Sequence, residues 1–412
     1  MDDKEKKRIE AVNRYIMGDK PSNICKDANR SEKWLFTWVK RFKTGEEEWY
    51  KSQSNAPKKH GRKTCENIES TIVTLRKVLM EGNKHESKYL GVGADAIQYR
   101  MVKQGFSKDE IPSVSTIKRI VKTHGLEVNK RERYKRVKSK KRYTILNPAQ
   151  IDEMHQMDFV GPRFIKGYGA VSSLNLIDVV CNRVHIEQYD TKSTDNIIDF
   201  LILYWRNNPI PRYLQVDNGM YFIGDFKYPR RFSRFVRFCL YVGVEVVFIN
   251  PKSPWMNGSI ENFNGWFDEK FWAKETFANL EDMRAKSTHF VGQYNDLSAW
   301  KKRNKSLEQI NPARILINSL KIPLGKLPLT KGKIHFIRMV DNEGKISVLN
   351  EAFKVGKEFI SEYVWATICL KKQTLEVFYR AKDQDTAVLI KKIEYELSGE
   401  VSDLRPDICK MS

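Results

Sequence analysis

Three carboxylates lie at places in the chain where an acid could take part in metal chemistry. Asp158 lies within the extended apolar run MHQMDFVGPRFI, where burying a charge is costly unless something compensates it. Asp217 ends the strand-like run RYLQVDNG, and Glu261 lies in PWMNGSIENFN, where a helix is expected to begin. If the strands that carry Asp158 and Asp217 are neighbours, all three acids converge on one edge of a sheet.

Such a cluster predicts bound divalent cations. Three close carboxylates repel one another and raise each other's pKa, whereas hard oxygen ligands with open water positions suit Mg²⁺ or Mn²⁺. Two ions about 3.5–4 Å apart can bracket a phosphodiester, one activating the nucleophile and the other stabilising the leaving oxygen. This chemistry needs no histidine. His155 points to the other face of its strand from Asp158, so we expect it to be structural.

Each acid taken alone also has an ordinary explanation. Asp-Asn-Gly is a favoured turn, and Glu261 could stabilise a helix through its dipole or help to cap it. Asp158 has the fewest such explanations. The hypothesis therefore depends on all three acids occurring in the right elements and in the right order.

Positive charge is concentrated in the first part of the chain. The 73 Lys and Arg residues against 51 Asp and Glu residues give a net charge of +22. Residues 1–150 hold 36 basic and 19 acidic residues, a net charge of +17, and residues 151–412 hold the remaining 37 and 32, a net charge of +5. A concentrated basic segment attracts polyanions, so we expect nucleic acid as the partner, and double-stranded DNA if the helical units below bind as helix-turn-helix domains. The alternative is a protein that is simply basic.

Membrane insertion and secretion are not expected. No run of about eighteen uncharged apolar residues occurs, and the first residues, MDDKEKKRIE, lack the apolar core of a signal peptide. No basic helix with a wide apolar face stands out. The six cysteines are scattered without a CxxC pair, which argues against a zinc ribbon or a disulfide framework and for a reducing compartment.

Residues 1–51 are predicted to form a helix-turn-helix DNA-binding domain. Three short helical patterns occur, with Ile16 and Phe42 among the expected packing positions, and Ser31 caps the third helix. The side chains positioned to reach DNA are Lys33, Thr37, Lys40 and Arg41. A small helical bundle with a solvated polar face is the alternative.

A second helix-turn-helix domain is predicted at residues 65–127, after a polar linker at 52–64. Its last helix repeats the pattern of a capped recognition helix and turns Lys118, Arg119 and Lys122 outward. Residues 128–148 are predicted to be a basic linker that follows DNA, because 129–142 carry nine basic residues and one acid. A solvated linker or helix face is the alternative there.

From about residue 150 the pattern changes to β-β-β-α-β-α-β-α. This order predicts an α/β domain at 149–315, with a mixed five-stranded sheet and helices on both faces. Residues 276–303 look helical again. Residues 325–400 are rich in strand patterns, and DNEG (341–344) is expected to join the first two strands as a hairpin, so we expect a small all-β, barrel-like domain.

The segment from QMDFVGP through LQVDNG to NPKSPWMNGSIENFNGWF resembles the catalytic core of the integrase-type transposases of bacterial insertion sequences, relatives of retroviral integrases. YN (294–295), NPAR (311–314), the tandem helix-turn-helix units and the strand-rich end also fit that family. The resemblance implies a ribonuclease-H-like fold and an Asp-Asp-Glu triad, which carries over to Asp158, Asp217 and Glu261.

The resemblance also implies how such a protein would act. Metal-activated water frees a 3′-hydroxyl at the element's end, and that hydroxyl attacks a target phosphodiester without ATP. The N-terminal units would read the element's ends, and a homo-oligomer would hold two of them. The implied location is prokaryotic and cytoplasmic, at the nucleoid.

Several positions depart from the family pattern. The interval from Asp217 to Glu261 is long, with the excess expected in the basic, aromatic segment 223–232. Gly265 and Asp268 stand where retroviral integrases carry basic residues, so we expect Lys252 or Lys270 to contact DNA instead. Asn257 is a further candidate for the DNA backbone. No His-His-Cys-Cys set of the kind that forms the family's zinc-binding N-terminal module occurs among the first sixty-five residues.

Two other functions remain open on the sequence. One is a catalytically inactive, transposase-derived DNA-binding protein, which the presence of all three acids disfavours. The other is a ribonuclease-H-like nuclease that cuts without joining, which the tandem helix-turn-helix units disfavour.

Overall fold

The computed structural model describes residues 2–45, 47–52, 64–128, 143, 145–224, 230–319, 321–404 and 406, together with the backbone of 408–411. Contacts divide the chain into two units, Met1–Thr64 and Cys65–Ser412. The predicted linkers at 52–64 and 128–148 lie largely outside the described residues, as does the middle of 223–232. The domain boundaries proposed from the sequence stay predictions.

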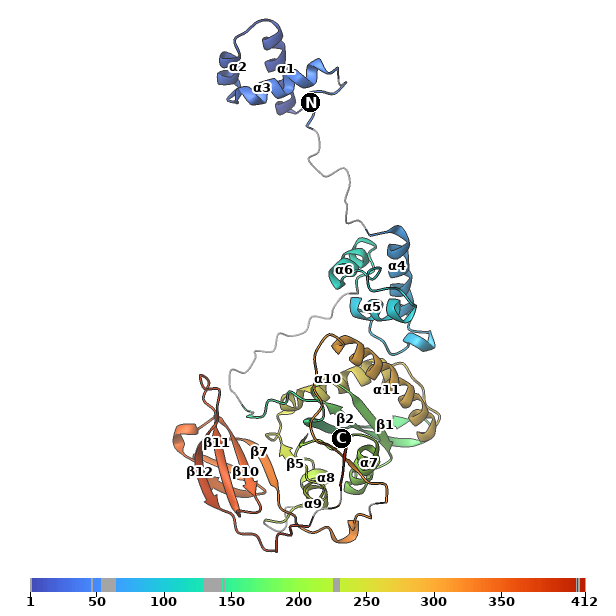
Figure 1. Cartoon of the computed structure of the whole chain (residues 1–412), viewed down its shortest axis with the longest axis vertical. Coiled ribbons are helices and arrows are strands. Elements are labelled where there is room, and N and C mark those ends of the chain that lie inside the picture. Colours follow the sequence, from blue (N-terminus) through green and yellow to red (C-terminus); the bar gives the residue numbers. More distant parts are fainter. Residues whose placement is uncertain are drawn as a thin grey trace. The chain divides into compact units, whose positions relative to one another are not determined.

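The N-terminal unit contains the three predicted helices (Figure 1): α1 (Asp3–Ile16), α2 (Pro21–Ala28) and α3 (Glu32–Lys43). Ser31 caps α3, because its hydroxyl accepts a hydrogen bond from the Trp34 amide. The core holds Val12 and Leu35, neither of which is exposed. The expected packing of Ile16 was wrong, since its side chain is 54% exposed, whereas the ring of Phe42, 39% exposed, packs edge-on against Trp49 with centroids 5.2 Å apart. Ile16 lies at the end of its helix.

The larger unit begins with the second group of predicted helices: α4 (Glu66–Glu81), the short 3₁₀ turn η1 (His85–Ser87), α5 (Ala94–Lys103) and α6 (Val114–Thr123). Ser113 caps α6 as Ser31 caps α3. Ile117 and Ile120 on the inner face of α6 pack into a core with α4, α5 and Leu297 near the end of the helix Leu280–Lys302. The opposite face of α6 is left exposed.

A nine-stranded sheet forms the centre of the larger unit, in the order β12-β11-β10-β7-β5-β4-β1-β2-β3. Its strands are β1 (Met154–Ile165), β2 (Gly169–Asp178), β3 (Val184–Tyr189), β4 (Tyr213–Val216), β5 (Glu245–Phe248), β7 (Lys333–Met339), β10 (Tyr363–Cys369), β11 (Thr374–Tyr379) and β12 (Val388–Glu394). β1 is antiparallel to β2 and parallel to β4, and β4 is parallel to β5.

Helices cover both faces of the β1–β5 part of this sheet (Figure 1). They are α7 (Thr194–Asn207), α8 (Met220–Ile223), α9 (Arg234–Tyr241), α10 (Gly258–Phe267) and α11 (Leu280–Lys302). Side chains alternate along a strand, so Met157 and Phe159 of β1 pack in the core with α7 and α9. Val171 and Ile177 of β2 pack in a second core with α10 and α11. Within the described residues, no helix is long and apolar enough to span a membrane.

The predicted five-stranded sheet with a separate small β-barrel was wrong in extent. β7 pairs in parallel with β5, so the C-terminal strands continue the central sheet. This pairing removes an open edge, because β5 would otherwise present unpaired backbone groups. Ile334 and Phe336 of β7 are fully buried there, which supplies the apolar contact.

The remaining strands pair locally. β8 (Lys345–Val348) pairs with β9 (Glu351–Lys354), not with β7 as the DNEG turn suggested, and β6 (Ala313–Leu316) pairs with β13 (Ile408–Met411). β7 is already flanked by β5 and β10, which leaves no edge for β8.

The β5–β7 contact predicts shared stability across the sheet. The rings of Phe248 and Phe336 stack with centroids 5.2 Å apart. We expect Phe336→Ala to lower the free energy of unfolding by about 3–5 kcal/mol and to speed hydrogen exchange in β4 and β5 as well as in β7. Val388→Ala, at a side chain that is 51% exposed on β12, is the control. Unchanged exchange in β4 and β5 would show that the two parts of the sheet are energetically separate.

Candidate active site

The structure brings the three predicted acids together. Asp158, Asp217 and Glu261 line one open cleft with a cavity volume of about 400 Å³. The segment Ile249–Pro254 that follows β5 forms another part of its wall. The cleft therefore lies at the carboxyl ends of the parallel strands β4 and β5, where open sheets place ligands.

Asp158 is oriented by two asparagines that the sequence did not reveal. Its Oδ2 accepts a hydrogen bond of 3.0 Å from Asn264 Nδ2. Asn264 Oδ1 in turn accepts one of 2.9 Å from Asn175 Nδ2, and Asn175 lies opposite Asp158 in the β1–β2 register. The sequence spacing could have indicated a place for Asn264 at the site, because Asn264 follows Glu261 by three residues and so lies on the same face of the helix.

Asp217 follows β4 directly and shapes the turn after it. Its Oδ1 accepts a 2.8 Å hydrogen bond from the Gly219 amide. The chain then enters α8, so Asp-Asn-Gly ends a strand before a helix and makes no hairpin here. Asp217 thus combines a turn role with a place in the cleft.

Glu261 lies in the first turn of α10, after the 3₁₀ turn η2 (Pro254–Asn257). Gln156 of β1 docks this helix, because its Oε1 accepts hydrogen bonds of 3.0 and 3.1 Å from the Ser259 and Ile260 amides. Gln215 of β4 donates through Nε2 to the Met256 carbonyl at 2.9 Å. The N–H groups of Ser259 and Ile260 at the start of the helix are therefore satisfied from the sheet.

The two glutamines form a matched pair. Gln156 and Gln215 lie opposite each other in the parallel β1–β4 register, each two residues before an aspartate of the cleft. Residues two apart on a strand share a face. One strand pair thus presents Asp158 and Asp217 to the cleft and also holds the helix that carries Glu261.

The cleft is electrostatically strained without a cation. Burial, and then the carboxylates of Asp217 and Glu261, raise the pKa of Asp158 to about 7. Burial also raises the pKa of Asp217. The nearby Lys192 ammonium acts in the opposite direction on the pKa of both aspartates. Lys192 donates to the Gly161 carbonyl at 2.6 Å, and sequence reasoning missed it.

Two candidate DNA contacts lie at this cleft. Lys252 lines it with an exposed side chain. Asn257 also lines it but is only 2% exposed, and its Oδ1 accepts a hydrogen bond from Gln215 Nε2. The structure therefore places Asn257 in the wall of the cleft. Lys270 lies in the short helical segment Asp268–Trp272, directly after α10, and pairs with Glu269.

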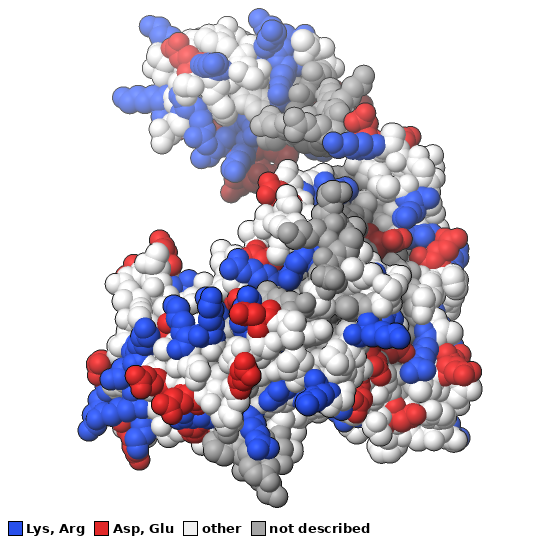
Figure 2. Space-filling view, turned by 60° about the horizontal axis from the view of Figure 1, so that its bottom comes forward, with Lys and Arg blue, Asp and Glu red and all other residues white. Residues whose placement is uncertain are grey.

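The other candidate DNA contacts lie on the two capped helices. Lys33, Thr37 and Lys40 are exposed on α3, and Arg41 lies with its guanidinium 4.7 Å from the centre of the Trp38 ring. The exposed basic side chains of α6 are Lys118, Arg119 and Lys122. Figure 2 shows that Lys and Arg side chains outnumber acidic ones on the visible face of the N-terminal unit, whereas both signs mix over the rest.

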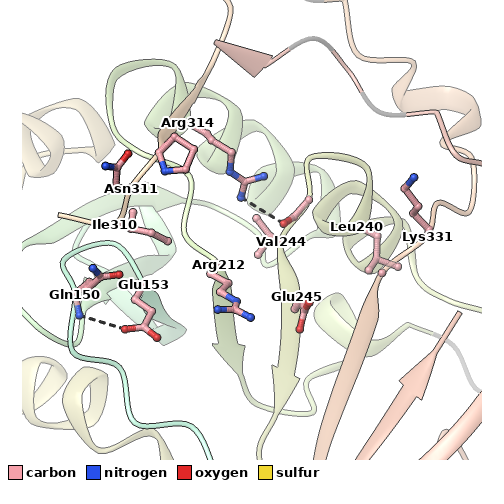
Figure 3. Close-up of a pocket in the computed structure, with 13 residues that line it drawn as sticks. Gln150, Glu153, Arg212, Leu240, Val244, Glu245, Ile310, Asn311, Arg314 and Lys331 are labelled. Carbon is pink, nitrogen blue, oxygen red and sulfur yellow. Dashed lines mark hydrogen bonds between the residues drawn. The ribbon is translucent and has the colours of Figure 1, made fainter. Parts of the chain in front are cut away.

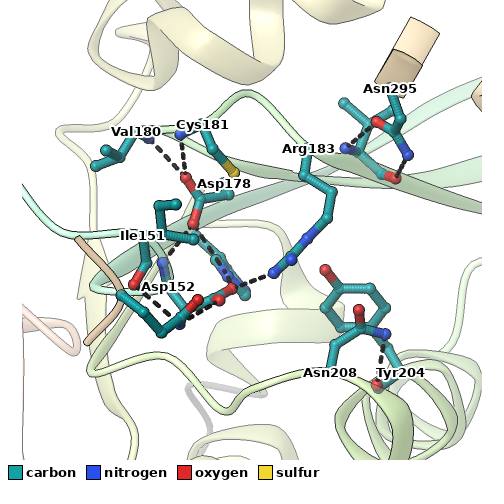
Figure 4. A network of polar contacts seen from close by, with 12 residues as sticks. Ile151, Asp152, Asp178, Val180, Cys181, Arg183, Tyr204, Asn208 and Asn295 are labelled. Atoms are coloured by element: carbon teal, nitrogen blue, oxygen red, sulfur yellow. Dashed lines mark hydrogen bonds and ion pairs between the residues drawn. The ribbon is translucent and has the colours of Figure 1, made fainter. Parts of the chain in front are cut away.

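A second acidic group lies around His155. Asp152, His155 and Asp178 are fully buried and close together (Figure 4). Asp152 Oδ1 accepts hydrogen bonds from His155 Nε2 at 2.8 Å and from the Arg183 guanidinium at 2.6 Å. The Val180 and Cys181 amides donate to Asp178. Protein donors thus contact both carboxylates, and the structural role of His155 stays a prediction.

A second pocket lies at the opposite ends of the same strands (Figure 3). Arg212 and Glu245, at the start of β4 and β5, line it together with Arg314. It contains none of the three predicted acids. We therefore place the candidate active site in the cleft at the carboxyl ends.

One comparison with known protein families finds an integrase-type match in part of the chain. A family model described as "Integrase core domain" matches residues 242–308, which include Glu261 and the wall of the cleft. The match supports such a core for that part of the chain. No curated protein matches the chain.

Similar solved structures include three from retroviruses. The HTLV-2 integrase catalytic core domain in complex with magnesium is 16% identical, with a TM-score of 0.23, over 29% of this chain and 70% of that one. The catalytic core domain of BIV integrase is 15% identical, with a TM-score of 0.26, over 39% and 88%. A simian T-cell lymphotropic virus intasome in complex with PP2A regulatory subunit B56 gamma is 12% identical, with a TM-score of 0.29, over 74% and 99%. The case for the site rests on its own geometry.

The raised pKa of Asp158 predicts a pH-dependent stability in the presence of a chelator. The ordinary pKa of this carboxyl is 3.8, so between pH about 4 and 7 the folded protein binds more protons than the unfolded chain. The free energy of unfolding then falls as pH rises through this window. We expect Asp158→Asn to reduce that slope and to raise the melting temperature at pH 8 by a few degrees.

Melting curves with EDTA between pH 5 and 8 measure this effect. Glu308→Gln, at an exposed acid outside the cleft, is the control. An unchanged slope in Asp158→Asn would mean that this carboxylate is not the group under strain.

Proposed function

We propose that this protein is an Asp-Asp-Glu transposase of the integrase type, encoded by a bacterial insertion sequence. It binds the ends of a mobile DNA element and catalyses metal-dependent end cleavage and strand transfer. The observation that carries the proposal is the shared cleft of Asp158, Asp217 and Glu261. The proposed location is the cytoplasm of a prokaryote, at the nucleoid.

The donor set fits Mg²⁺ or Mn²⁺, with two ions expected. Carboxylate oxygens in an open, water-accessible cleft are what these cations prefer, and a cation there would offset the burial and the neighbouring carboxylates that raise the pKa of Asp158. Asp158, Asp217 and Glu261 would hold the ions. Bound ions would supply a stronger nucleophile and stabilise the charge on the leaving oxygen.

The protein's own residues keep these ligands in place. Asn264 donates a hydrogen bond to one oxygen of Asp158. This bond fixes the plane of the carboxylate and therefore the direction of its other oxygen. Gln156 fixes the start of α10 and with it the height of Glu261 above the sheet. Lys252, which lines the cleft and is exposed, would contact a DNA phosphate.

The proposed reaction has two steps, a hydrolysis and a transesterification. Water attacks the phosphodiester at the element's end, and the P–O bond breaks to leave a free 3′-hydroxyl and a 5′-phosphate. The 3′-hydroxyl then attacks a target phosphodiester, so one P–O bond forms as another breaks. No ATP is needed, because the second step conserves the number of phosphodiester bonds.

The helical units would supply DNA binding. Both α3 and α6 are capped helices with exposed basic side chains, which fits recognition helices that read double-stranded DNA at the element's ends. Two ends must be held for joining to one target, so we propose a homo-oligomer on DNA. Asn257, which lines the cleft, is proposed as a further contact to the DNA backbone.

Asp217→Asn tests the catalytic assignment. We expect Mg²⁺-dependent cleavage of an element-end duplex to fall by at least about 100-fold, because a metal ligand is lost, while binding of the same duplex is retained. Glu343→Gln, at an exposed acid far along the chain, should keep both activities. A variant that cleaves normally would refute the assignment of Asp217.

The products of the wild-type reaction distinguish the other two functions. Cleaved ends that never join target DNA would indicate a nuclease. End binding without any cleavage in Mg²⁺ or Mn²⁺ would indicate an inactive DNA-binding derivative.

A further inference from the structure

Arg338 of β7 is a buried arginine next to the cleft. Its side chain belongs to a residue only 5% exposed, and burial lowers the pKa of the guanidinium to about 10. Its acceptors are the carbonyls of Ser347, Ile249 and Ile337 and the side chain of Asn218. None of these acceptors is a carboxylate. Among the described residues no carboxylate pairs with this guanidinium, and a buried cation without such a partner is costly.

The contacts of Arg338 converge on the turn that carries Asp217. Its guanidinium donates to Asn218 Oδ1 at 2.9 Å and to the Ile249 carbonyl at 2.9 Å. Asn218 Nδ2 donates to the same Ile249 carbonyl at 2.7 Å. Arg338, Asn218 and the end of β5 thus form a closed triangle of hydrogen bonds directly after Asp217.

β7 also holds the opposite wall of the cleft. The Met339 amide donates to Asn250 Oδ1 at 3.0 Å, and Asn250 Nδ2 donates to Ser253 Oγ at 2.9 Å. Asn218, Asn250 and Ser253 all line the cleft. β7 therefore contacts the turn after Asp217 through Arg338 and the segment after β5 through Met339.

We infer that Arg338 is a positioning residue for the active site, acting through Asn218 to fix the turn of Asp217. The C-terminal part of the chain is then an integral piece of the catalytic core. That the turn positions a metal ligand, Asp217, rests on the proposed function. That Arg338 fixes this turn rests on the geometry alone.

A lysine cannot replace this arginine. The planar guanidinium carries five N–H donors in a fixed fork, whereas an ammonium is a single point with three donors. In Arg338→Lys, the bonds to Ser347, Ile249 and Asn218 cannot all be kept. The turn would lose its fixed orientation although the positive charge remains.

The chain offers a matched control. Arg314 donates to the carbonyls of Pro211, Val242 and Gly243 at the opposite ends of β4 and β5 (Figure 3). Arg314→Lys makes the same chemical change at an arginine that faces away from the cleft. Arg314→Lys therefore controls for the loss of a guanidinium from backbone carbonyls, at a half-buried side chain whose hydrogen bonds are 3.4–3.5 Å long.

The test measures Mn²⁺ binding to the full-length protein by electron paramagnetic resonance, together with hydrogen exchange of residues 214–224. In Arg338→Lys we expect a Mn²⁺ dissociation constant raised about 10–100-fold and faster exchange in this segment. Arg314→Lys should leave both unchanged. Melting temperatures of both variants report whether each is folded.

Asn218→Ala provides an independent route if Arg338→Lys does not fold. It should weaken Mn²⁺ binding to a similar extent, and in the double variant the two effects should not add, because they remove one pathway. Unchanged Mn²⁺ affinity and unchanged exchange in folded Arg338→Lys would overturn the inference, as would additive effects.

The same data separate this inference from the proposed function. If the wild-type protein binds no Mn²⁺, the proposed metal-dependent function fails. Faster exchange at 214–224 in Arg338→Lys alone would still support the positioning role.

Discussion

The fold is arranged around the cost of holding three carboxylates close together in a partly buried cleft. Asp158 bears most of this cost, because it lies inside β1 beside the charges of Asp217 and Glu261. Such an arrangement persists only where the surrounding structure enforces it. Strands β1 and β4, helix α10 and strand β7 each contribute polar contacts whose evident effect is to hold one of the three acids.

These contacts link distant segments in a consistent way. Gln156 and Gln215 tie α10 to the sheet, and Arg338 ties the Asp217 turn to the C-terminal strands. The three side chains are long and polar, lie largely buried and mostly bind backbone groups. Backbone positions change little when neighbouring side chains adapt, so such bonds fix the acids more firmly than side-chain contacts alone.

Much of the fold could be predicted because each element carries its own periodicity. The run MHQMDFVGPRFI coincides with β1, and the helices at both capped serines begin where the caps indicate. The three acids could be placed in one cleft because strand order fixes which strand ends meet. The contact of Gln156 with the start of α10 could also have been suspected, because Gln156 lies two residues before Asp158 just as Gln215 lies two residues before Asp217.

Other features have no local signal. The pairing of β5 with β7 joins segments far apart in the chain, and a hairpin-like turn such as DNEG gives no information about which distant edge is open. Arg338 looked like one basic residue in a strand pattern. Asn257 looked exposed because polar residues usually are, but Gln215 satisfies its amide inside the wall of the cleft.

The central claim is that the cleft of Asp158, Asp217 and Glu261 binds the catalytic cations. Anomalous diffraction from crystals of the protein bound to an element-end duplex and soaked in Mn²⁺ tests it most directly. The account predicts anomalous peaks between these three carboxylates. An empty cleft at saturating Mn²⁺, or a peak at Asp152, His155 and Asp178 instead, would contradict it.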